Sequence, residues 1–302
     1  MENPAIPLSS HAAVAAGKSC WLCLGPAVQE TQGIAFGALT PDHFAITDSH
    51  YGTTLGIYRC QSCGFRFCPD AGDVTSLYAD LEDEEYERTR AQRSVQARYL
   101  LATLKAHKSS GKLLDIGAGS GILVEEAERA GFDAQGVEPS QWLVQQARNK
   151  NIPVLQGVFP QAVEGIQYDV IALIDVLEHV TQPLKLLQDI GRHLKQDGVA
   201  LIVTPDGQSV AAKAMGKKWW HYRIAHISYF DKKTLTLALA NAGLEPLSWC
   251  RPTWYFPLDY LLSRLGQYLP GVGRLASARV TKSINVPLNL FDSWLVVPRK
   301  AS

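Results

Sequence analysis

The stretch "LLDIGAGSG", residues 113–121, places three glycines at every second position directly after a short apolar run. Glycine loses more conformational entropy on folding than any other residue, so a loop this rich in glycine indicates that a ligand or another backbone comes close to the chain. Units of strand, glycine turn and helix bind phosphate-containing and nucleoside-containing ligands. The neighbouring sequence decides between these ligand classes.

Apolar runs alternate with helical patterns from Gly111 onward. The expected strands are 112–117, 134–140, 153–157, 168–176, 199–206, 244–250 and 291–299. The expected helices are 120–131, 141–150, 182–198 and 230–243. This alternation predicts a doubly wound, Rossmann-like α/β sheet of seven strands, in which ligands lie at the carboxyl ends of the strands.

Capping residues set the expected ends of these helices. Ser120 and Asp231 are expected to cap the first and the last of them, because their short side chains accept backbone N–H bonds. Gly198 closes the segment 182–198 and is expected just past the last helical residue.

The composition limits the class of protein. The chain has 302 residues, of which 46% are hydrophobic, which suits one or two globular domains. Because 29 basic residues balance 29 acidic ones, the net charge gives no indication of a nucleic-acid or membrane partner. We read no signal peptide and no run of the roughly 18 apolar residues that a transmembrane helix needs. We therefore expect a cytoplasmic protein with cysteines as thiols or metal ligands.

Two familiar glycine motifs do not fit the loop. A P-loop requires Gly-Lys-Ser/Thr, but Ile122 follows Gly121. The dinucleotide fingerprint G-x-G-x-x-G requires a third glycine at position 122 or 124, and these positions hold Ile122 and Val124.

The sequence instead contains an acidic residue followed by three alternating glycines: Asp115, Gly117, Gly119 and Gly121. This pattern resembles the first motif of class I S-adenosylmethionine-dependent methyltransferases. The resemblance continues through "GVEPS", "YDVIALIDVLEHVTQP", "LKQDGVALIVTPD" and "HISYFDKKTLTLALANAGL", and it covers roughly residues 111–250 and 289–298.

The resemblance implies S-adenosylmethionine as cofactor, bound over the glycine loop. Glu138 ends the second strand, where a carboxylate accepts the ribose hydroxyls. Asp175 follows the fourth strand and is expected near the methionine part of the cofactor. Members of the family often carry an acidic residue after the third strand, against the adenine. Gly157 and Val158 stand there in this chain, so no acidic adenine partner is assigned.

Two Cys-x-x-Cys pairs precede this region, and they comprise Cys20, Cys23, Cys60 and Cys63. Four thiolates suit a tetrahedral structural zinc ion, although the 36 residues between the pairs imply an inserted hairpin or loop. The alternatives are unpaired thiols or a redox pair, with Cys68 as a spare or alternative ligand. The arrangement resembles bacterial methyltransferases with an N-terminal zinc-binding segment, some of which act on nucleotide-linked sugars.

These patterns divide the chain into three parts. The expected organisation is a zinc-ribbon-like domain at 1–78, a linker helix within 79–110, and a methyltransferase domain at 111–302. An insertion at 251–288 interrupts the last domain, and it contains five basic residues against one acidic residue. The insertion is expected to be an amphipathic cap; the alternatives are a lid over an anionic substrate and peripheral contact with an anionic membrane.

Histidines near the expected strand ends are the candidate general bases, because histidine titrates near neutral pH. His179 follows Glu178 after the fourth strand, whereas His221 and His226 lie in "WWHYRIAHISYF" after the fifth. Sequence alone leaves the choice between these two clusters open.

We therefore predict a methyltransferase of a small molecule or glycan precursor, such as a nucleotide- or lipid-linked sugar. The alternatives are a non-catalytic relative that binds cofactor or partners, and an RNA methyltransferase. Residues 1–80 contain three basic and seven acidic side chains, which argues against nucleic acid as a partner. The acceptor atom and the oligomeric state remain open.

Overall fold

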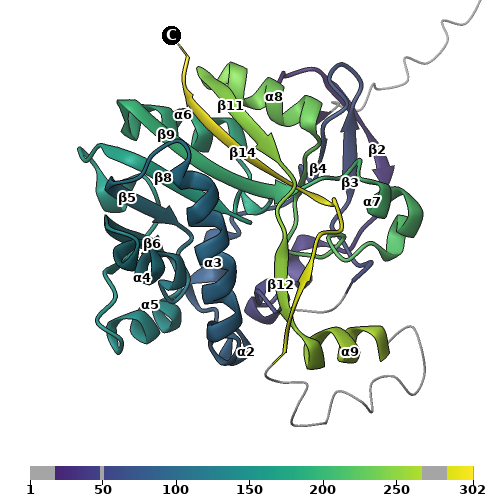
Figure 1. Ribbon diagram of the computed structural model, residues 1–302. Coiled ribbons are helices and arrows are strands. Elements are labelled where there is room, and N and C mark those ends of the chain that lie inside the picture. The colour runs from purple at the N-terminus through teal and green to yellow at the C-terminus, as the bar shows by residue number, and fades with distance from the viewer. Residues whose placement is uncertain (1–17, 48–50, 267–283, 302) are drawn as a thin grey trace, which may run out of the picture.

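The computed structural model describes residues 18–47, 51–266 and 284–301. A seven-stranded sheet has the strand order β11-β14-β9-β8-β5-β6-β7 (Figure 1). Its strands are β5 (Gly111–Ile116), β6 (Phe132–Glu138), β7 (Val154–Gln156), β8 (Tyr168–Ile174), β9 (Leu194–Pro205), β11 (Leu244–Cys250) and β14 (Ser293–Lys300). Strand β14 is antiparallel to both of its neighbours, while β7, β6, β5, β8 and β9 pair in parallel. The predicted doubly wound sheet of seven strands is confirmed.

Helices cover both faces of this sheet. One face packs against α3 (Arg90–Lys105), α4 (Ile122–Arg129) and α5 (Gln141–Arg148), and the other against α6 (Pro183–His193) and α8 (Lys232–Asn241). The alternation along a strand decides the face: Leu113 of β5 packs with the first group and Leu114 with the second. Both leucines are fully buried, as expected for a parallel sheet covered on both sides.

The shorter elements connect this framework. They are the helices α1 (Thr75–Ala79), α2 (Glu84–Arg88), α7 (Val210–Met215) and α9 (Leu258–Gly266), and the 3₁₀ turns η1 (Phe36–Ala38), η2 (Pro41–Phe44), η3 (Gln161–Val163), η4 (Leu177–His179) and η5 (Gly216–Lys218).

Two helices, α2 and α3, occupy the region 79–110 in which one linker helix is expected. Asp83 starts α2 by accepting the backbone N–H of Tyr86. The hydroxyl of Thr89 then donates to the carbonyl of Glu85, which satisfies the last turn of α2 locally and separates it from α3.

Two expected helix ends also differ. Gly121, with a φ of +78°, precedes α4, while the Ser120 hydroxyl accepts a hydrogen bond from Arg90. Helix α6 ends at His193 instead of running to residue 197, because Leu194 is buried and pairs with Tyr168 of β8. The predicted cap of α8 is confirmed, since the Asp231 carboxylate accepts the Thr234 N–H at 2.7 Å.

The N-terminal segment forms a second sheet that includes a strand from much later in the chain. Its strands are β1 (Lys18–Ser19), β2 (Pro26–Thr31), β3 (Ile57–Cys60), β4 (Arg66–Phe67) and β10 (Ser228–Tyr229). Ser228 of β10 pairs with Phe67 of β4, and the rings of Phe65 and Phe230 lie 4.9 Å apart. The segment therefore shares strands and core with the larger domain.

The insertion after β11 begins with β12 (Trp254–Pro257), which pairs with β13 (Asn285–Leu288) as a separate two-stranded sheet beside α3. Helix α9 follows β12 (Figure 1). Residues 267–283, which contain three of the five basic side chains on which the lid and membrane alternatives depend, lie outside the described residues. Within the described chain, no helix combines the length and apolar character that crossing a membrane requires.

Candidate active site

A cavity of about 730 Å³ opens at the carboxyl ends of β5, β6 and β8. The glycine loop after β5, Glu138 at the end of β6 and Asp175 after β8 all line it, as do His179, His221 and His226. The two histidine clusters that the sequence presents as alternatives thus border a single cavity, together with the residues expected to hold the cofactor.

The glycine loop needs its glycines for two different reasons. Gly117, Gly119 and Gly121 all have positive φ values, which L-residues with a side chain rarely adopt. A Cβ on Gly119 would lie 2.6 Å from the Tyr86 hydroxyl, at the cavity wall. A Cβ on Gly121 would instead lie 2.5 Å from Ile152, inside the core. Gly121 thus serves packing, whereas Gly119 leaves room for the side chain of Tyr86, which lines the cavity.

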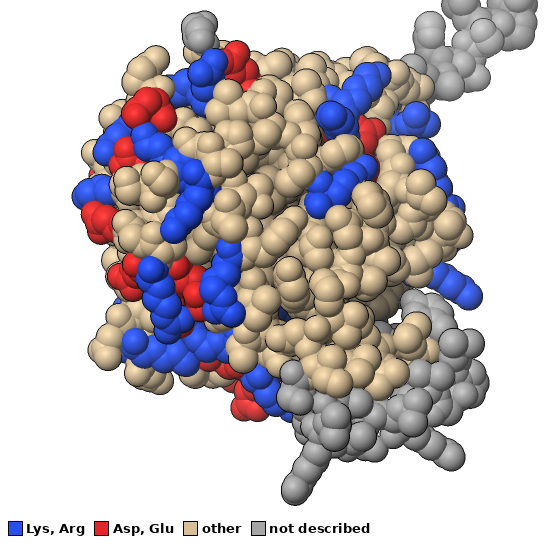
Figure 2. All heavy atoms as spheres, viewed as in Figure 1, with Lys and Arg blue, Asp and Glu red and all other residues tan. Residues whose placement is uncertain are grey.

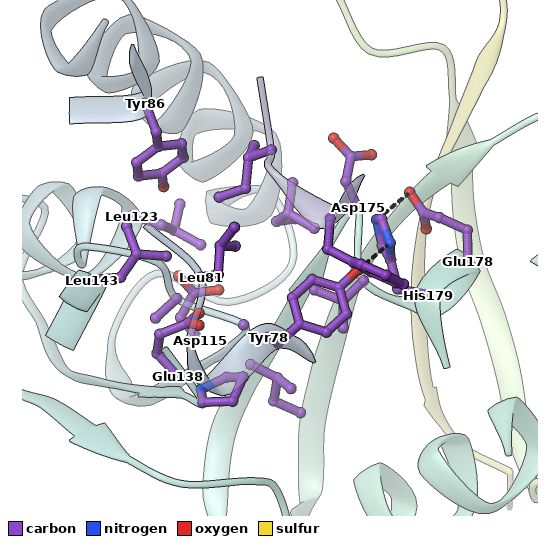
Figure 3. A pocket seen from close by; sticks show the side chains of 18 of the residues that line it. Tyr78, Leu81, Tyr86, Asp115, Leu123, Glu138, Leu143, Asp175, Glu178 and His179 are labelled. Carbon is purple, nitrogen blue, oxygen red and sulfur yellow. Dashed lines mark hydrogen bonds and ion pairs between the residues drawn. The ribbon is translucent and has the colours of Figure 1, made fainter. Parts of the chain in front are cut away.

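Backbone N–H groups hold the Glu138 carboxylate in place. Gly119 donates to its Oε2 and Ser140 donates to its Oε1, each at 2.9 Å. Each oxygen keeps a further lone pair. Burial raises the pKa of Glu138 to about 7, and burial together with the Glu138 charge raises the pKa of Asp115 to about 8. The two carboxylates lie close together in Figure 3.

Asp175 follows β8 with a φ of +52°, an unusual conformation for a non-glycine residue. Its Oδ1 is buried and has no hydrogen-bond partner among the described residues. Burial raises the pKa of Asp175 to about 7, although the nearby Arg93 cation acts in the opposite direction. A strained backbone that points an unpaired carboxylate oxygen into a cavity is typical of a ligand-binding position.

The three histidines form a row at the other end of the cavity. The ring centroids of His179 and His226 are 4.7 Å apart, and those of His226 and His221 are 5.4 Å apart. His221 Nε2 lies 3.3 Å from Oδ2 of the buried Asp292, which also accepts the Trp220 indole N–H at 2.8 Å. This contact fixes the orientation of the His221 ring.

His179 has neighbours on both sides (Figure 3). Its Nδ1 lies 2.7 Å from the Tyr78 hydroxyl and 2.9 Å from the carbonyl oxygen of Ala225, and its Nε2 lies 4.0 Å from Glu178 Oε1. Burial lowers the pKa of His179 to about 3 and raises the pKa of Glu178 well above its ordinary value.

Several of these partners were not found from the sequence. Tyr78 and Tyr86 come from short helices that precede the glycine loop, and Arg93 lies on α3 with its guanidinium 4.3 Å from the Tyr86 ring. Asp292 lies just before the last strand. Only the fold brings Tyr78, Tyr86 and Arg93 to the cavity and Asp292 behind His221, so no local motif indicates them.

Segments outside the sheet supply much of the apolar wall. The N-terminal region contributes Phe44, Ile46, Val74 and Leu81, and the insertion contributes Trp254, Phe256, Pro257 and Tyr260. The cavity therefore combines a polar floor at the strand ends with apolar walls from both ends of the chain.

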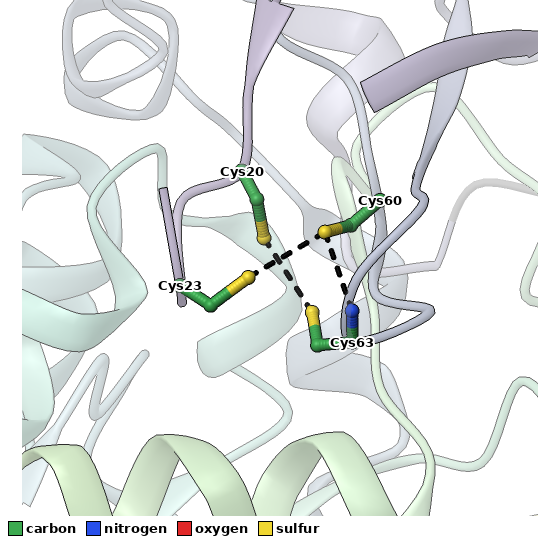
Figure 4. A group of neighbouring side chains, drawn as sticks. All are labelled: Cys20, Cys23, Cys60 and Cys63. Atoms are coloured by element: carbon green, nitrogen blue, oxygen red, sulfur yellow. Dashed lines mark hydrogen bonds between the residues drawn. The ribbon is translucent and has the colours of Figure 1, made fainter. Parts of the chain in front are cut away.

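The four cysteines point toward one common centre (Figure 4). The sulfur atoms of Cys20 and Cys63 are 3.7 Å apart, and those of Cys23 and Cys60 are 3.5 Å apart. A disulfide requires about 2.05 Å, whereas thiolates around a tetrahedral zinc ion lie about 3.8 Å apart. Cys68 is buried elsewhere, so the cysteine group that can hold a metal consists of the four predicted cysteines.

The two cysteine turns have the same local form. Leu24 N–H donates to the Cys20 carbonyl, and Gly64 N–H donates to the Cys60 carbonyl, each at 3.0 Å. Leu24 and Gly64 both have positive φ values. Backbone N–H groups also point at sulfur, as Cys63 N–H does toward Cys60. Such contacts stabilise thiolates, which is consistent with a metal site.

Residues 86–248 match the sequence model of the family described as Methyltransferase domain, which is more than half of the chain. The chain belongs to the methyltransferase domain family. The match begins at Tyr86, beside the glycine loop, and ends within β11. The N-terminal cysteine segment and the insertion lie outside the region that defines this methyltransferase domain.

Curated relatives resemble the same central region. A ubiquinone biosynthesis O-methyltransferase of Rickettsia akari is 25% identical over 133 residues, which are 41% of this chain and 53% of that protein. A mitochondrial ubiquinone biosynthesis O-methyltransferase of Schizosaccharomyces pombe is 35% identical over 105 residues, which are 32% of this chain and 38% of that protein. The chain spans about half the length of the curated relatives it matches.

A solved complex of the Haloferax volcanii Trm112 methyltransferase activator and a methyltransferase contains a chain of similar fold. The TM-score is 0.54 at 17% identity, and the match covers 72% of this chain and 93% of that one. At this identity the likeness supports the methyltransferase fold alone.

Proposed function

We propose that the protein transfers the methyl group of S-adenosylmethionine to an oxygen atom of a small molecule with an apolar body. The observation that carries this proposal is the joining, in one cavity, of the glycine loop and Glu138 with a row of three histidines. The family supports the cofactor, and the two O-methyltransferase relatives support oxygen as the acceptor atom.

The residues at the strand ends fit the cofactor. The Glu138 carboxylate is oriented by Gly119 and Ser140 and keeps lone pairs for two ribose hydroxyls. Asp175 has an unpaired oxygen suited to the methionine ammonium group, and the Arg93 cation suits its carboxylate. The bound cofactor supplies an activated methyl group on a sulfonium, so the protein's task is to position the acceptor and exclude water.

The walls favour an acceptor with an uncharged, apolar body over a diphosphate-linked sugar. Three cations line the described part of the cavity, and two of them are already committed. Lys185 pairs with Asp189 at 2.8 Å, and the Arg223 guanidinium donates to the carbonyls of Ala45 and Ile46. The remaining cation, Arg93, is the one assigned above to the cofactor carboxylate.

His221 is the residue that we assign as general base. Its Nε2 faces Asp292, so the proton of the neutral ring resides on Nε2 and Nδ1 is left as the acceptor. A buried carboxylate behind a histidine holds the ring in one orientation and stabilises the imidazolium that forms when it takes the acceptor's proton. The deprotonated acceptor oxygen would then be held for the methyl group that the bound cofactor supplies.

We further propose that the four cysteines bind a structural zinc ion. The segment that they hold together contributes Phe44, Val74 and Tyr78 to the cavity. In this proposal the metal shapes the wall of the acceptor site and takes no part in the chemistry.

An RNA acceptor is not favoured. Figure 2 shows acidic and basic side chains mixed over the helices at left and a wide uncharged centre, not a continuous basic face.

A direct test incubates the purified full chain with S-adenosylmethionine and a panel of phenols, sugars, nucleotide sugars and RNA. The readouts are S-adenosylhomocysteine formation and a product one methyl group heavier by mass spectrometry. We expect methylation of hydroxyls on apolar, uncharged acceptors. Methylation of nucleotide sugars or RNA alone would overturn the proposed substrate class. Tight cofactor binding without turnover on any class would favour a non-catalytic binding protein instead.

A further inference from the structure

Glu178, His179 and His226 place three side chains of metal-ligand type around one point at the histidine end of the cavity. One donor atom from each lies within 4.8 Å of the other two. Among the described residues, the four cysteines form the other group of this kind. Neither the zinc proposed at the cysteines nor the cofactor at the glycine loop accounts for this second cluster.

Two of the donor atoms have no partner among the described residues. Glu178 Oε1 and His226 Nδ1 are both buried without a hydrogen bond. Glu178 is 1% exposed and His226 is 5% exposed, so both side chains are shielded from bulk solvent. Buried polar atoms are nearly always paired in folded proteins. A cation bound between them would satisfy both atoms at once.

The groups behind these side chains orient them as in a metal site. His179 Nδ1 lies 2.9 Å from the Ala225 carbonyl, which only accepts, so this nitrogen carries the ring proton. The lone pair is then on Nε2, the nitrogen that faces Glu178 Oε1 at 4.0 Å. Histidines that ligate metals usually donate their other N–H to a carbonyl in this way. The second oxygen of Glu178 accepts from the Thr204 hydroxyl at 2.9 Å.

We propose that Glu178, His179 and His226 bind a divalent transition-metal cation. Two imidazoles and one carboxylate, with further positions open to the cavity, are the donor set of catalytic zinc sites and of related metal sites. Donor atoms that bind Zn²⁺ at about 2.0–2.2 Å lie roughly 3–4 Å apart. Side-chain shifts of less than about 1 Å would therefore close the cluster onto the ion.

The chemistry of such a site deepens the proposed function, on which this step rests. An acceptor hydroxyl at an open position of the cation loses its proton more readily, because the cation stabilises the alkoxide or phenolate. The proton passes to His221, whose ring stacks on His226 at 5.4 Å. The acceptor oxygen then bonds to the methyl carbon while the carbon–sulfur bond breaks, which leaves neutral S-adenosylhomocysteine.

The test measures metal binding without turnover, so its result does not depend on the proposed methyl transfer. The full chain, reduced and stripped of metal, is titrated with Co²⁺ while absorption is followed. Thiolate ligands give intense near-ultraviolet charge-transfer bands, whereas nitrogen and oxygen ligands give only weak visible bands. We expect two equivalents: one with the thiolate bands and one without them.

Three variants and a control locate the second equivalent. Glu178→Gln and His226→Gln should lose it and keep the thiolate-bound ion, and Thr204→Val should weaken it about 10-fold by releasing the Glu178 carboxylate. His43→Gln, a histidine outside the cavity, should retain both equivalents. A single equivalent in the wild-type protein, or a second equivalent that survives both Glu178→Gln and His226→Gln, would overturn the site. If circular dichroism shows that a glutamine variant has lost its fold, the wild-type stoichiometry and the affinity of Thr204→Val for the second equivalent decide whether the site exists.

Discussion

The hydroxyl of Tyr78 lies 2.7 Å from Nδ1 of His179, although 101 residues separate them in the sequence. The N-terminal segment thereby contacts the histidine row directly. We expect Tyr78→Phe to lower kcat roughly 10-fold by loosening the His179 ring, since partners behind a functional histidine typically contribute this much. Cofactor affinity, measured by calorimetry, should not change. Tyr58→Phe in β3 is the matched control; equal turnover in the two variants would mean that Tyr78 only packs.

The pair of His221 and Asp292 predicts a graded loss of activity. His221→Ala should lower kcat roughly 10²-fold or more, because the acceptor's proton loses its base. Asp292→Asn keeps an oxygen acceptor but removes the charge that stabilises the imidazolium, so its loss should be smaller. Trp220→Phe removes the other hydrogen bond to Asp292 and should leave kcat nearly unchanged. Near-normal turnover of His221→Ala would exclude it as the base.

Alanine variants of Gly119 and Gly131 distinguish the effect of a new steric contact from the effect of backbone strain. Both have positive φ, but a Cβ on Gly119 would meet the Tyr86 hydroxyl, whereas nothing lies within 4 Å of a Cβ on Gly131. Gly119→Ala and Gly131→Ala should each cost about 1 kcal/mol of stability, as seen in thermal unfolding. Only Gly119→Ala should weaken S-adenosylhomocysteine binding, by calorimetry. Equal affinities would mean that the cofactor does not approach this loop.

The raised pKa of Glu138 predicts a pH-dependent cofactor affinity. Ribose hydroxyls donate to the carboxylate form, so binding requires loss of the proton, and the pKa of about 7 places the transition near neutrality. Affinity for S-adenosylhomocysteine should fall about 10-fold from pH 8 to pH 6. Glu138→Gln should bind S-adenosylhomocysteine more weakly and lose this pH dependence, while Asp115→Asn should retain the pH dependence. A flat profile in the wild-type protein would contradict the ribose assignment.

The Glu138 carboxyl group also makes the stability of the cofactor-free protein depend on pH, and the direction of this dependence can be predicted. Its folded-state pKa of about 7 lies above the ordinary value of 4.5, so folding favours the protonated form. The contribution is complete below pH 4.5 and is lost as the pH rises through 7. Cofactor binding to the carboxylate should therefore raise the melting temperature more at pH 8 than at pH 6.

Loss of the metal at the cysteines should weaken binding of the acceptor more than binding of the cofactor. Cys60→Ser should lose the thiolate-bound metal and destabilise the segment that contributes Phe44 and Val74 to the cavity. The KM for the acceptor should rise, while the calorimetric affinity for S-adenosylhomocysteine should change little. Cys250→Ser, outside the cluster, is the control. An unchanged KM after loss of the metal would mean that the segment does not shape the acceptor site.

Sequence patterns predicted the sheet well because its strands are long and apolar and its helices amphipathic. The position of Glu138 followed from the end of one strand and the glycine loop before it, and both lie in a single local unit. The end of α6 was missed because "LKQD" has good helix-forming residues, whereas the pairing of Leu194 with Tyr168 draws it into β9. Tertiary pairing outweighed local propensity there.

Contacts between distant segments could not be predicted. Strand β10 has two residues, too few for any periodicity to indicate a strand. The pairing of His221 with Asp292 and of Tyr78 with His179 depends on how three separate parts of the chain meet. The histidines themselves were recognisable as candidates, but their grouping into one row was not.

The pairing of β4 with β10 has a consequence for synthesis of the chain. Arg66 and Phe67 leave the ribosome long before Ser228 and Tyr229 exist to pair with them. Until then the N-terminal sheet keeps an open edge, with backbone N–H and C=O groups that another nascent chain can pair with. Early closure of the cysteine turns would hold β3 and β4 together during this interval. The late arrival of β10 then completes the N-terminal sheet.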